Sequence, residues 1–383
     1  MGIARGELQK LGHLAESVFG TRVGNAFDEV VFNTESLVPT RQWFQSQRCL
    51  GDRQLADGRL GRKVISGDIV CELVYANHDR FLEMLLSNTK IAAPFAAVTG
   101  TTISAVDSGN TIDDSGNGLG NISVGDFVYV TGFTSANNNG MFKVTAAAAG
   151  SITLAGSAIT DEAAGDSVTI REVDLTNGVV EKFSTFHKRT VDASATVAEM
   201  DVLGGVITQG ALTIPANGIA TMTFSVMGKD WSNGATTATF NALTEYDPFD
   251  GLTGTYAIDN TANTNMTAVS VNVDNGHTPT EPLGTNTMTE AIPRKFSVSG
   301  SFSIYHTGTV EIAKLLAETE SGLTFTMSDP AGNQHVVLLP RVKYTSAGVT
   351  KQDDGPNMET INFTALKDQD VTDKTIGWVF IAA

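Results

Sequence analysis

The feature that most constrains the fold is a pattern that occurs twice. Residues 64–75 (VISGDIVCELVY) and 298–305 (VSGSFSIY) both place Ser-Gly, as Ser66-Gly67 and Ser299-Gly300, at the head of an alternating segment that runs to a tyrosine. Each segment is followed by a short helical pattern with a Leu-Leu pair, at 81–86 (FLEMLL) and 310–316 (VEIAKLL). Two copies are too few for a solenoid. They predict a β-rich domain of two halves, each contributing one strand–helix unit.

Period-two alternation also assigns the faces of these two strands. In the first copy it places Ile69, Cys71 and Leu73 toward a core, and in the second Phe302 and Ile304. The residues between them should face a lumen or a partner. The later helix is expected over residues 309–320, with a stop at Ser321-Gly322, because glycine adopts the left-handed conformation that ends many helices.

Composition favours strands joined by tight turns. The chain has 383 residues, 38 of them Gly, and only 17% are charged. Its net charge of −17 argues against a sequence-reading nucleic-acid binder, which carries a basic face. The chain has no run of 18 apolar residues, so we expect no transmembrane helix. The N-terminus also has no apolar signal core. Cys49 and Cys71 show no metal-ligand spacing, and we expect reduced thiols.

The residue pattern of the chain changes at Pro94. From there to residue 172, short alternating segments are separated by Gly, Asn, Ser and Asp. We predict three parts: residues 1–93 as the first half of the core with an N-terminal arm, 94–172 as an inserted small β domain, and 173–383 as the second half with a C-terminal tail. Residues 1–35 are expected to become ordered only against another molecule, and residues 231–293 to be loop-rich.

A search for catalytic chemistry finds little. The six histidines are scattered, and the chain has neither a phosphate-binding loop nor a Gly-x-Ser-x-Gly elbow. Residues 113–117 (DDSGN) lack the carboxylate pattern of a calcium loop and are read as a solvated turn. Paired carboxylates for glycoside hydrolysis would leave no local trace, but an aromatic content of 7% is thin for a sugar cleft. We therefore expect no enzyme, no cofactor and no metal.

Two segments carry opposite charge at equivalent places. Residues 41–63 contain six basic residues against Asp52 and Asp57, whereas residues 231–293 contain seven acidic residues and no base. Each segment precedes one copy of the Ser-Gly strand. One reading is two solvated loops. The other is a heterologous interface in which one surface of a subunit meets a different surface of the next copy. The candidate interface residues are Arg48, Arg53, Arg59 and Arg62.

The chain resembles the tail tube proteins of long-tailed bacteriophages. The resemblance lies in 34–37 (TESL), the loop through Arg48 and Arg53, 66–73 (SGDIVCEL) with its helix, and 210–230 (GALTIPANGIATMTFSVMGKD). It implies a mainly β, tail-tube-type β-sandwich with short flanking helices and, here, an inserted small all-β domain. Six subunits would form a ring, and rings would stack into a hollow tube through which the genome passes during ejection.

The resemblance also implies partners and a location. The partners would be other copies of the chain, the tape measure protein, the tail terminator, and distal tail or baseplate proteins, with DNA passing without sequence-specific binding and no membrane. The protein would be assembled in the host cytoplasm and reside in the virion. An insert on the outside of the tube favours a non-contractile, siphovirus-type tail, because a sheath would leave it little room. The alternatives are a virion adhesin or decoration protein of β-sandwich type, and an acid-assisted hydrolase.

Overall fold

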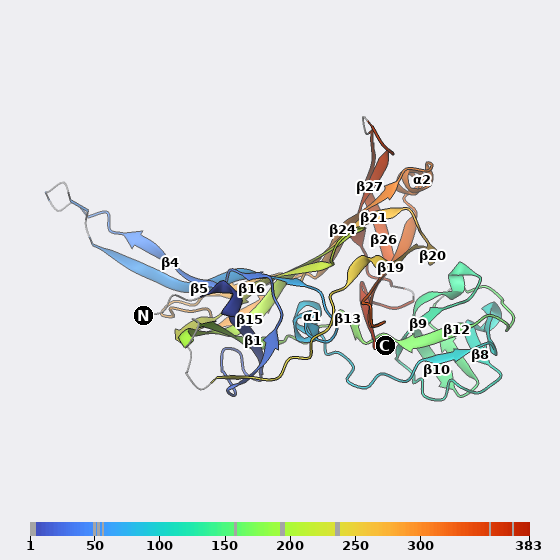
Figure 1. Ribbon diagram of the computed structural model, residues 1–383, viewed down its shortest axis with the longest axis horizontal. Coiled ribbons are helices and arrows are strands. Elements are labelled where there is room, and N and C mark those ends of the chain that lie inside the picture. Colours follow the sequence, from blue (N-terminus) through green and yellow to red (C-terminus); the bar gives the residue numbers. More distant parts are fainter. Residues whose placement is uncertain are drawn as a thin grey trace.

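The computed structural model describes residues 5–48, 51, 54–55, 57–156, 159–191, 196–233, 238–351, 354–369 and 371–383. Within them the fold is mainly β, as the sequence predicts. A 19-stranded mixed sheet forms the body of the molecule, a separate 7-stranded antiparallel sheet lies at one end, and two short α-helices flank the body (Figure 1).

The two halves of the main sheet contain the same ordered set of elements, to which the first half adds the short strand β3. The first half comprises β3 (Thr34–Glu35), β4 (Val38–Gln45), β5 (Gly58–Glu72), α1 (Asp79–Leu86), β14 (Phe183–Val191), β15 (Thr196–Pro215), β16 (Thr221–Gly228) and β17 (Asp230–Asn233). The second half comprises β21 (Met266–Asp274), β24 (Ser297–Tyr305), α2 (Val310–Leu316), β25 (Glu320–Ser328), β26 (Gln334–Thr350), β27 (Met358–Ala365) and β28 (Gly377–Ile381).

The two halves also pair their strands in the same way. In the first half, β4 pairs with β5, β5 with β16, β16 with β15, and β15 with both β14 and β17. In the second half, β21 pairs with β24, β24 with β27, β27 with β26, and β26 with both β25 and β28. All of these pairings are antiparallel. Two halves of matching topology are therefore present, and β14 to β17, which the sequence assigned to the second half within residues 173–383, belong to the first of them.

The repeated Ser-Gly has a steric reason. A Cβ on Gly67 would lie 2.4 Å from the carbonyl oxygen of Ser36, and a Cβ on Gly300 would lie 2.3 Å from that of Ser270. These separations are too short for a side chain, so only glycine lets the neighbouring strand cross so closely at either place. The same close approach explains the glycine at both positions.

The N-terminal residues belong to the chain's own sheet, so the expectation that they order only against another molecule is wrong. β1 (Lys10–Glu16) pairs with β14 and with β2 (Ala26–Val30), and β18 (Thr239–Phe240) adds to β2. In the second half, β19 (Asp250–Ile258) pairs with β25 and with β20 (Thr261–Ala262) in the corresponding way. The glycines at 12, 20 and 24 suggested an arm, but pairing with β14 satisfies the backbone of this segment.

The core lies on one face of the duplicated sheet. All five residues predicted to face it, Ile69, Cys71, Leu73, Phe302 and Ile304, are buried. The apolar face of α1 covers the first half, and Phe81 packs edge-on against Phe224 of β16 with ring centroids 5.2 Å apart. Burying each such side chain contributes roughly 1.5–3 kcal/mol.

The second helix is shorter than expected. α2 ends at Leu316, and Ser321 and Gly322 lie inside strand β25, so the prediction of a stop at Ser321-Gly322 is wrong. The left-handed residue of this turn is Glu318, with φ of 53°. Asp259 Oδ1 accepts the Gly322 backbone N–H at 2.8 Å, which holds that residue at the start of the strand.

The segment 231–293 is also more regular than expected. Besides β17 to β21 it contains the hairpin of β22 (His277–Thr280) and β23 (Glu290–Pro293). In β21, valines at 269, 271 and 273 alternate with small polar residues, and all three are buried. Its polar composition comes from one exposed strand face and not from a continuous loop.

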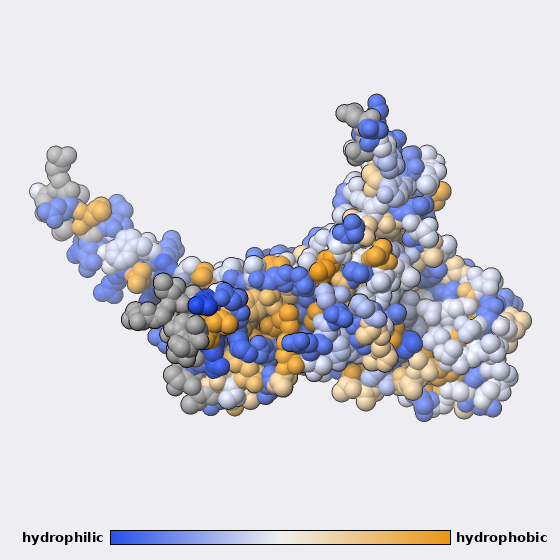
Figure 2. All heavy atoms as spheres, in the orientation of Figure 1, coloured by the Kyte–Doolittle hydropathy of each residue, from blue (hydrophilic) through white to orange (hydrophobic). Residues whose placement is uncertain are grey.

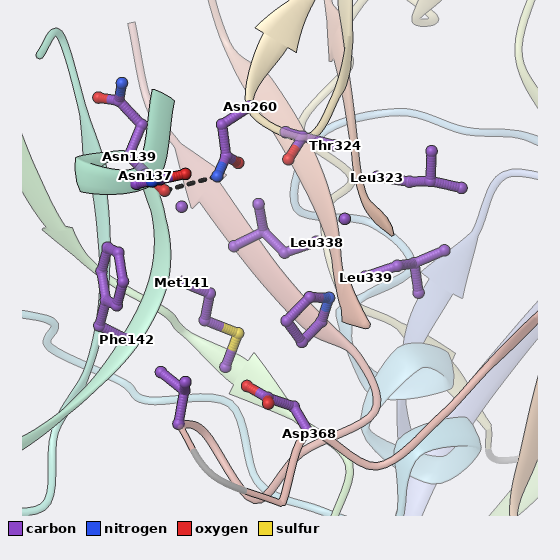
Figure 3. A pocket seen from close by; sticks show the side chains of 14 residues that line it. Asn137, Asn139, Met141, Phe142, Asn260, Leu323, Thr324, Leu338, Leu339 and Asp368 are labelled. Atoms are coloured by element: carbon purple, nitrogen blue, oxygen red, sulfur yellow. Dashed lines mark hydrogen bonds between the residues drawn. The ribbon is translucent and has the colours of Figure 1, made fainter. Parts of the chain in front are cut away.

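Residues 98–172 form the separate sheet, with a hydrophobic core of its own. Its strands are β6 (Val98–Gly100), β7 (Ile103–Val106), β8 (Thr111–Asp114), β9 (Phe127–Thr131), β10 (Gly140–Ala148), β11 (Ser151–Leu154) and β12 (Val168–Glu172), and β13 (Leu175–Thr176) returns the chain to β28. Met141 packs against Val336, Leu338 and Val379 of the main body. Above this contact Asn260 Nδ2 donates to the Asn139 carbonyl at 2.6 Å (Figure 3).

Candidate functional site: a polar face across eight strands

Eight strands of the two halves make one unbroken path through the main sheet. The order is β4, β5, β16, β15, β21, β24, β27 and β26, and the two halves join where β15 pairs with β21. Two long hairpins, β4–β5 and β26–β27, project from the body in different directions (Figure 1). The strand path ends at these two hairpins.

One face of this path is covered by small polar side chains, because each strand alternates a buried apolar residue with a short polar one. β24 shows the pattern most clearly, with Ser297, Ser299, Ser301 and Ser303 between buried residues. We call this surface the polar face. Its members are Ser36, Val38 and Thr40; Val64, Ser66, Asp68, Val70 and Glu72; Thr221, Thr223, Ser225 and Met227; Gln209, Ala211 and Thr213; Ala268, Ser270, Asn272 and Asp274; Ser297, Ser299, Ser301, Ser303 and Tyr305; Met358, Thr360, Asn362 and Thr364; and Ser346, Gly348 and Thr350.

The members of the polar face include acids but no Lys or Arg. Lys343, which lies opposite Thr364 on the same side of β26, marks the margin of the face and forms an ion pair with Glu318 at 2.8 Å. The three carboxylates of the face are Asp68, Glu72 and Asp274, and Asp68 accepts a hydrogen bond from Ser225 Oγ at 2.7 Å. At one end Arg294, in the loop after β23, lines the same depression as Asp274. Since phosphate affinity comes mainly from Lys and Arg, this face offers a nucleic-acid backbone very little to bind.

Some hydroxyls and amides of the polar face bond to one another across the strands. Asn362 Nδ2 donates to Ser346 Oγ at 2.7 Å, and the hydroxyls of Ser303 and Thr360 are 3.1 Å apart. Most of the side chains of this face are short, so it presents few projections.

Three of the predicted interface arginines, Arg48, Arg59 and Arg62, lie on or near the β4–β5 hairpin. They differ in their hydrogen-bond partners and in their exposure. Arg62 Nη2 donates to the Pro282 carbonyl at 2.7 Å, within the same chain. Beside it, Lys63 forms an ion pair with Asp230 at 2.7 Å and donates its backbone N–H to Asn286. The basic segment therefore already meets the acidic segment inside one subunit, at the root of the hairpin.

The outer arginines, Arg48 and Arg59, are exposed and could contact another subunit. Arg59 is exposed on β5, and the exposed Arg48 donates its Nε to Ser46 Oγ at 3.1 Å. Arg53 lies outside the described residues. Whether Arg48 and Arg59 contact another copy remains a prediction.

The β4–β5 hairpin also exposes large apolar side chains. Trp43 is 54% exposed and Phe44 53%, and Leu60 and Val64 of β5 are comparably open. Apolar side chains stand out among charged ones along this projection (Figure 2). A hairpin with both faces in solvent buries too little to be stable alone, so it needs a cover.

The apolar residues of the N-terminal segment divide between the chain's own core and its surface. Leu11 is fully buried in the core, Leu14 is half-buried, and Phe19 packs edge-on against Phe183. Val18 is 61% exposed and Leu8 is partly exposed. Val18 and Leu8 are therefore the most accessible of these side chains to a partner.

Within the part of the chain that the structure describes, no group of three or more His, Cys, Asp or Glu side chains could hold a metal ion. Asp114 instead closes its turn, accepting hydrogen bonds from the backbone of Gly116 and Gly118. Among the described helices none is both long and apolar enough to span a membrane. Cys71 is a free, buried thiol whose pKa is raised by burial.

Sequence reasoning missed the polar face as a unit. It assigned the alternation in β5 and β24, but a residue's partners in a sheet depend on distant strands. The signal that was available is the run of Ser, Thr and Asn at every second position in five separate segments.

Comparison with protein families gives one match. A family model described as phage tail tube protein matches residues 6–365, nearly the whole chain. No curated protein matches the sequence.

Proposed function

Because the chain belongs to the phage tail tube protein family, we propose that its copies close into rings, and that the rings stack into a hollow tube with the polar face turned inward. The protein is a structural component of the virion tail and not an enzyme. The proposed tube carries the genome during ejection. The sequence resemblance implies six subunits around its axis, and each subunit of such a ring would correspond either to a whole chain or to one of the chain's two matched halves.

The observation that carries this proposal is the chemistry of the polar face. A channel for DNA must let phosphates slide, and each Lys or Arg contact would add affinity that slows them. An eight-strand surface rich in short hydroxyls meets that requirement, because it has three carboxylates and its one marginal lysine, Lys343, is paired with Glu318. The same surface would serve poorly as an adhesin, because Tyr305 is the one aromatic side chain among its members and none is Arg, whereas aromatic and Arg anchors dominate recognition sites.

The other surfaces have proposed places in the tube. Residues 94–172 are proposed as an independently folded domain on the outside, which suits a non-contractile tail without a sheath. The tape measure protein would occupy the lumen before ejection, and the terminator and distal tail proteins would cap the two ends. Arg48 and Arg59, exposed on a projecting hairpin, are proposed to contact a neighbouring subunit.

The experiment reverses the chemistry of the lumen. We expect phage particles assembled with Ser299→Arg to eject DNA several-fold more slowly than wild type, and the slowing to be greatest at low salt. The matched control is Ser108→Arg, which adds the same charge to an exposed turn of the 94–172 sheet. Slower ejection for Ser299→Arg alone supports the proposal, whereas equal rates for both variants would contradict it.

A further inference from the structure

The two halves of the chain meet in a seam, where β15 pairs with β21. We propose that the outer end of β26 in one subunit pairs antiparallel with β4 of the next, and that three subunits close the ring. This inference rests on the proposed tube function and specifies how many chains form each ring and in which register they meet.

The internal seam gives the geometry. β15 pairs with β16 along one edge and with β21 along the other, in a register that runs from Gln209 opposite Asp274 to Pro215 opposite Ala268. β21 is the first strand of the second half. The seam thus joins the long strand of one half to the first strand of the following half.

The long strands β15 and β26 match residue by residue. Each has one extra, unpaired residue against its hairpin partner, Thr208 in β15 and Thr345 in β26. Beyond this bulge, Gly210 opposes Phe224 in the first half, and Ala347 opposes Ile361 in the second. Since Phe224 and Ile361 face Ile69 and Phe302 in the repeated Ser-Gly strands, the alignment holds across three strands.

The first strands β4 and β21 match in the same way. Ser66 opposes Val38 in the first half, and its counterpart Ser299 opposes Asn272 in the second. Transferring the internal register to two copies predicts their contacts. Ser346 would lie opposite Thr40 of the next subunit, Gly348 opposite Val38, and Val349 opposite Leu37.

Both edges that the seam needs are open in the subunit. Within the described residues, β4 pairs only with β5, and the outer end of β26 pairs only with β27. The exposure of Val349 shows the missing neighbour: it is 41% exposed, whereas Leu212, at the matching position of the internal seam, is 1% exposed. A second copy of this chain is the occupant that this geometry fits.

The open edge of β4 is guarded against wrong partners. The Ser36 backbone N–H donates to the Asp68 carbonyl of β5. Because backbone groups along a strand point alternately to its two edges, those of Leu37 and Pro39 point to the open edge. Pro39 has no N–H to donate, and the Leu37 N–H is held by the Glu35 carboxylate at 3.0 Å. Such features blunt an edge strand against random pairing, and the seam would have fewer hydrogen bonds than its internal counterpart.

The number of chains follows from the size of the barrel. With strands about 4.8 Å apart and tilted about 45°, the barrel diameter between backbones grows by roughly 2.2 Å per strand. Eight strands per chain then give about 35 Å for two chains, 52 Å for three and 104 Å for six, before side chains take about 10 Å. A DNA duplex, whose grooves are about 8 Å deep on either side, is roughly 20 Å wide. Two chains leave almost no clearance, three leave a modest one, and six leave far more than a duplex needs.

Disulfide trapping tests the register and counts the chains. In a Cys49→Ser background, Thr40→Cys and Ser346→Cys are combined in one chain, assembled into tubes and mildly oxidised. Opposed residues of this kind lie within disulfide reach. A denaturing gel without reductant should show linked chains up to a closed three-chain species and nothing larger.

Two controls calibrate the trap. The pair Gln209→Cys and Asp274→Cys occupies the matching positions of the internal seam and should cross-link within a single chain. The pair Thr40→Cys and Thr350→Cys is displaced by four residues, about 13 Å, and should not cross-link.

Each outcome has its own meaning. Linked chains up to six would overturn the count of three. Tubes that form without cross-links, while the internal control pair links, would overturn the seam but leave the tube function intact. Failure of the wild-type chain to assemble at all would instead contradict the proposed function. Native mass spectrometry of wild-type rings gives the count independently, with about 121 kDa expected for three 40.4 kDa chains.

Discussion

Thr208 and Thr345 are the bulged residues of the two longest strands, and each lies where its strand changes neighbours. β15 pairs with β14 and β17 up to Gly205, with β16 from Val206 onward, and with β21 after Thr208. β26 pairs with β25 and β28 up to Lys343 and with β27 from Val342 onward, and after Thr345 β27 is its one neighbour among the described strands. A bulge bends its strand and increases the local twist, so these residues direct both halves from the body into the polar face.

Deleting Thr208 and deleting Thr345 should therefore have different effects on folding and assembly. Removing one residue reverses the face of every side chain beyond it. We expect deletion of Thr208 to abolish folding, because Leu212 and Ile214 would leave the core. Deletion of Thr345 should leave a folded subunit that no longer assembles, since residues 346–350 are largely exposed. Circular dichroism and sedimentation of the two deletions check this; a Thr345 deletion that still forms tubes would contradict the role given to β26.

Residues 94–172 should be dispensable for tube formation. We expect a chain in which a short Gly-Ser linker replaces them to assemble into thinner-walled tubes, because this sheet has its own core. Its removal uncovers Val336, Leu338 and Val379, which pack against Met141. A second version with Val336→Thr and Val379→Thr should restore solubility if the first aggregates. Electron microscopy gives the readout, and loss of the folded main body in both versions would show that the domain is not autonomous.

Stability should fall in mild acid because of buried histidine. His335 is fully buried among Phe249, Trp378 and Phe380, and burial, followed by the charge of Lys90, lowers its pKa well below the usual range. Below pH 6.5 the unfolded chain binds a proton that the folded chain does not, so folding is disfavoured as the pH falls. At pH 5 this loss amounts to at most about 2 kcal/mol for one histidine.

The variant His335→Phe should lose less stability than wild type between pH 7 and pH 5, as measured by urea unfolding. Burial raises the pKa of Asp174 to about 6, which acts in the opposite direction because the folded chain then binds the proton first. Asp174 is present in both proteins, so the comparison isolates His335. Identical pH profiles would show that His335 is not the group responsible.

The outer arginines should affect the rate of assembly more than its end point. Exposed ion pairs contribute about 0.2–1 kcal/mol each, so Arg48→Glu combined with Arg59→Glu should slow polymerisation at low salt. High salt screens exposed charges and should narrow the difference from wild type. Light scattering at two salt concentrations measures this, with Arg171→Glu in the 94–172 sheet as a charge-reversal control. If the double variant assembled at the wild-type rate, Arg48 and Arg59 would make no contact that matters for assembly.

The sequence was informative wherever local chemistry decides structure. The Ser-Gly repeat, the core-facing residues of β5 and β24, and the apolar helix α1 all depend on alternation or on one glycine contact. The N-terminal segment was misjudged because its order comes from β14, more than 150 residues away along the chain. The helix end at Leu316 was missed because Asp259, and not Gly322, fixes the start of β25. The polar face and the two open edges depend on which strands become neighbours, and no local pattern contains that information.

Cryo-electron microscopy of tubes grown from the purified wild-type chain tests the central claim most directly. The account predicts a hollow tube whose inner wall is formed by the serines of β24 and the threonines of β16, with the 94–172 sheet outside. Solid filaments, closed particles without a lumen, or a tube with the polar face turned outward would contradict it.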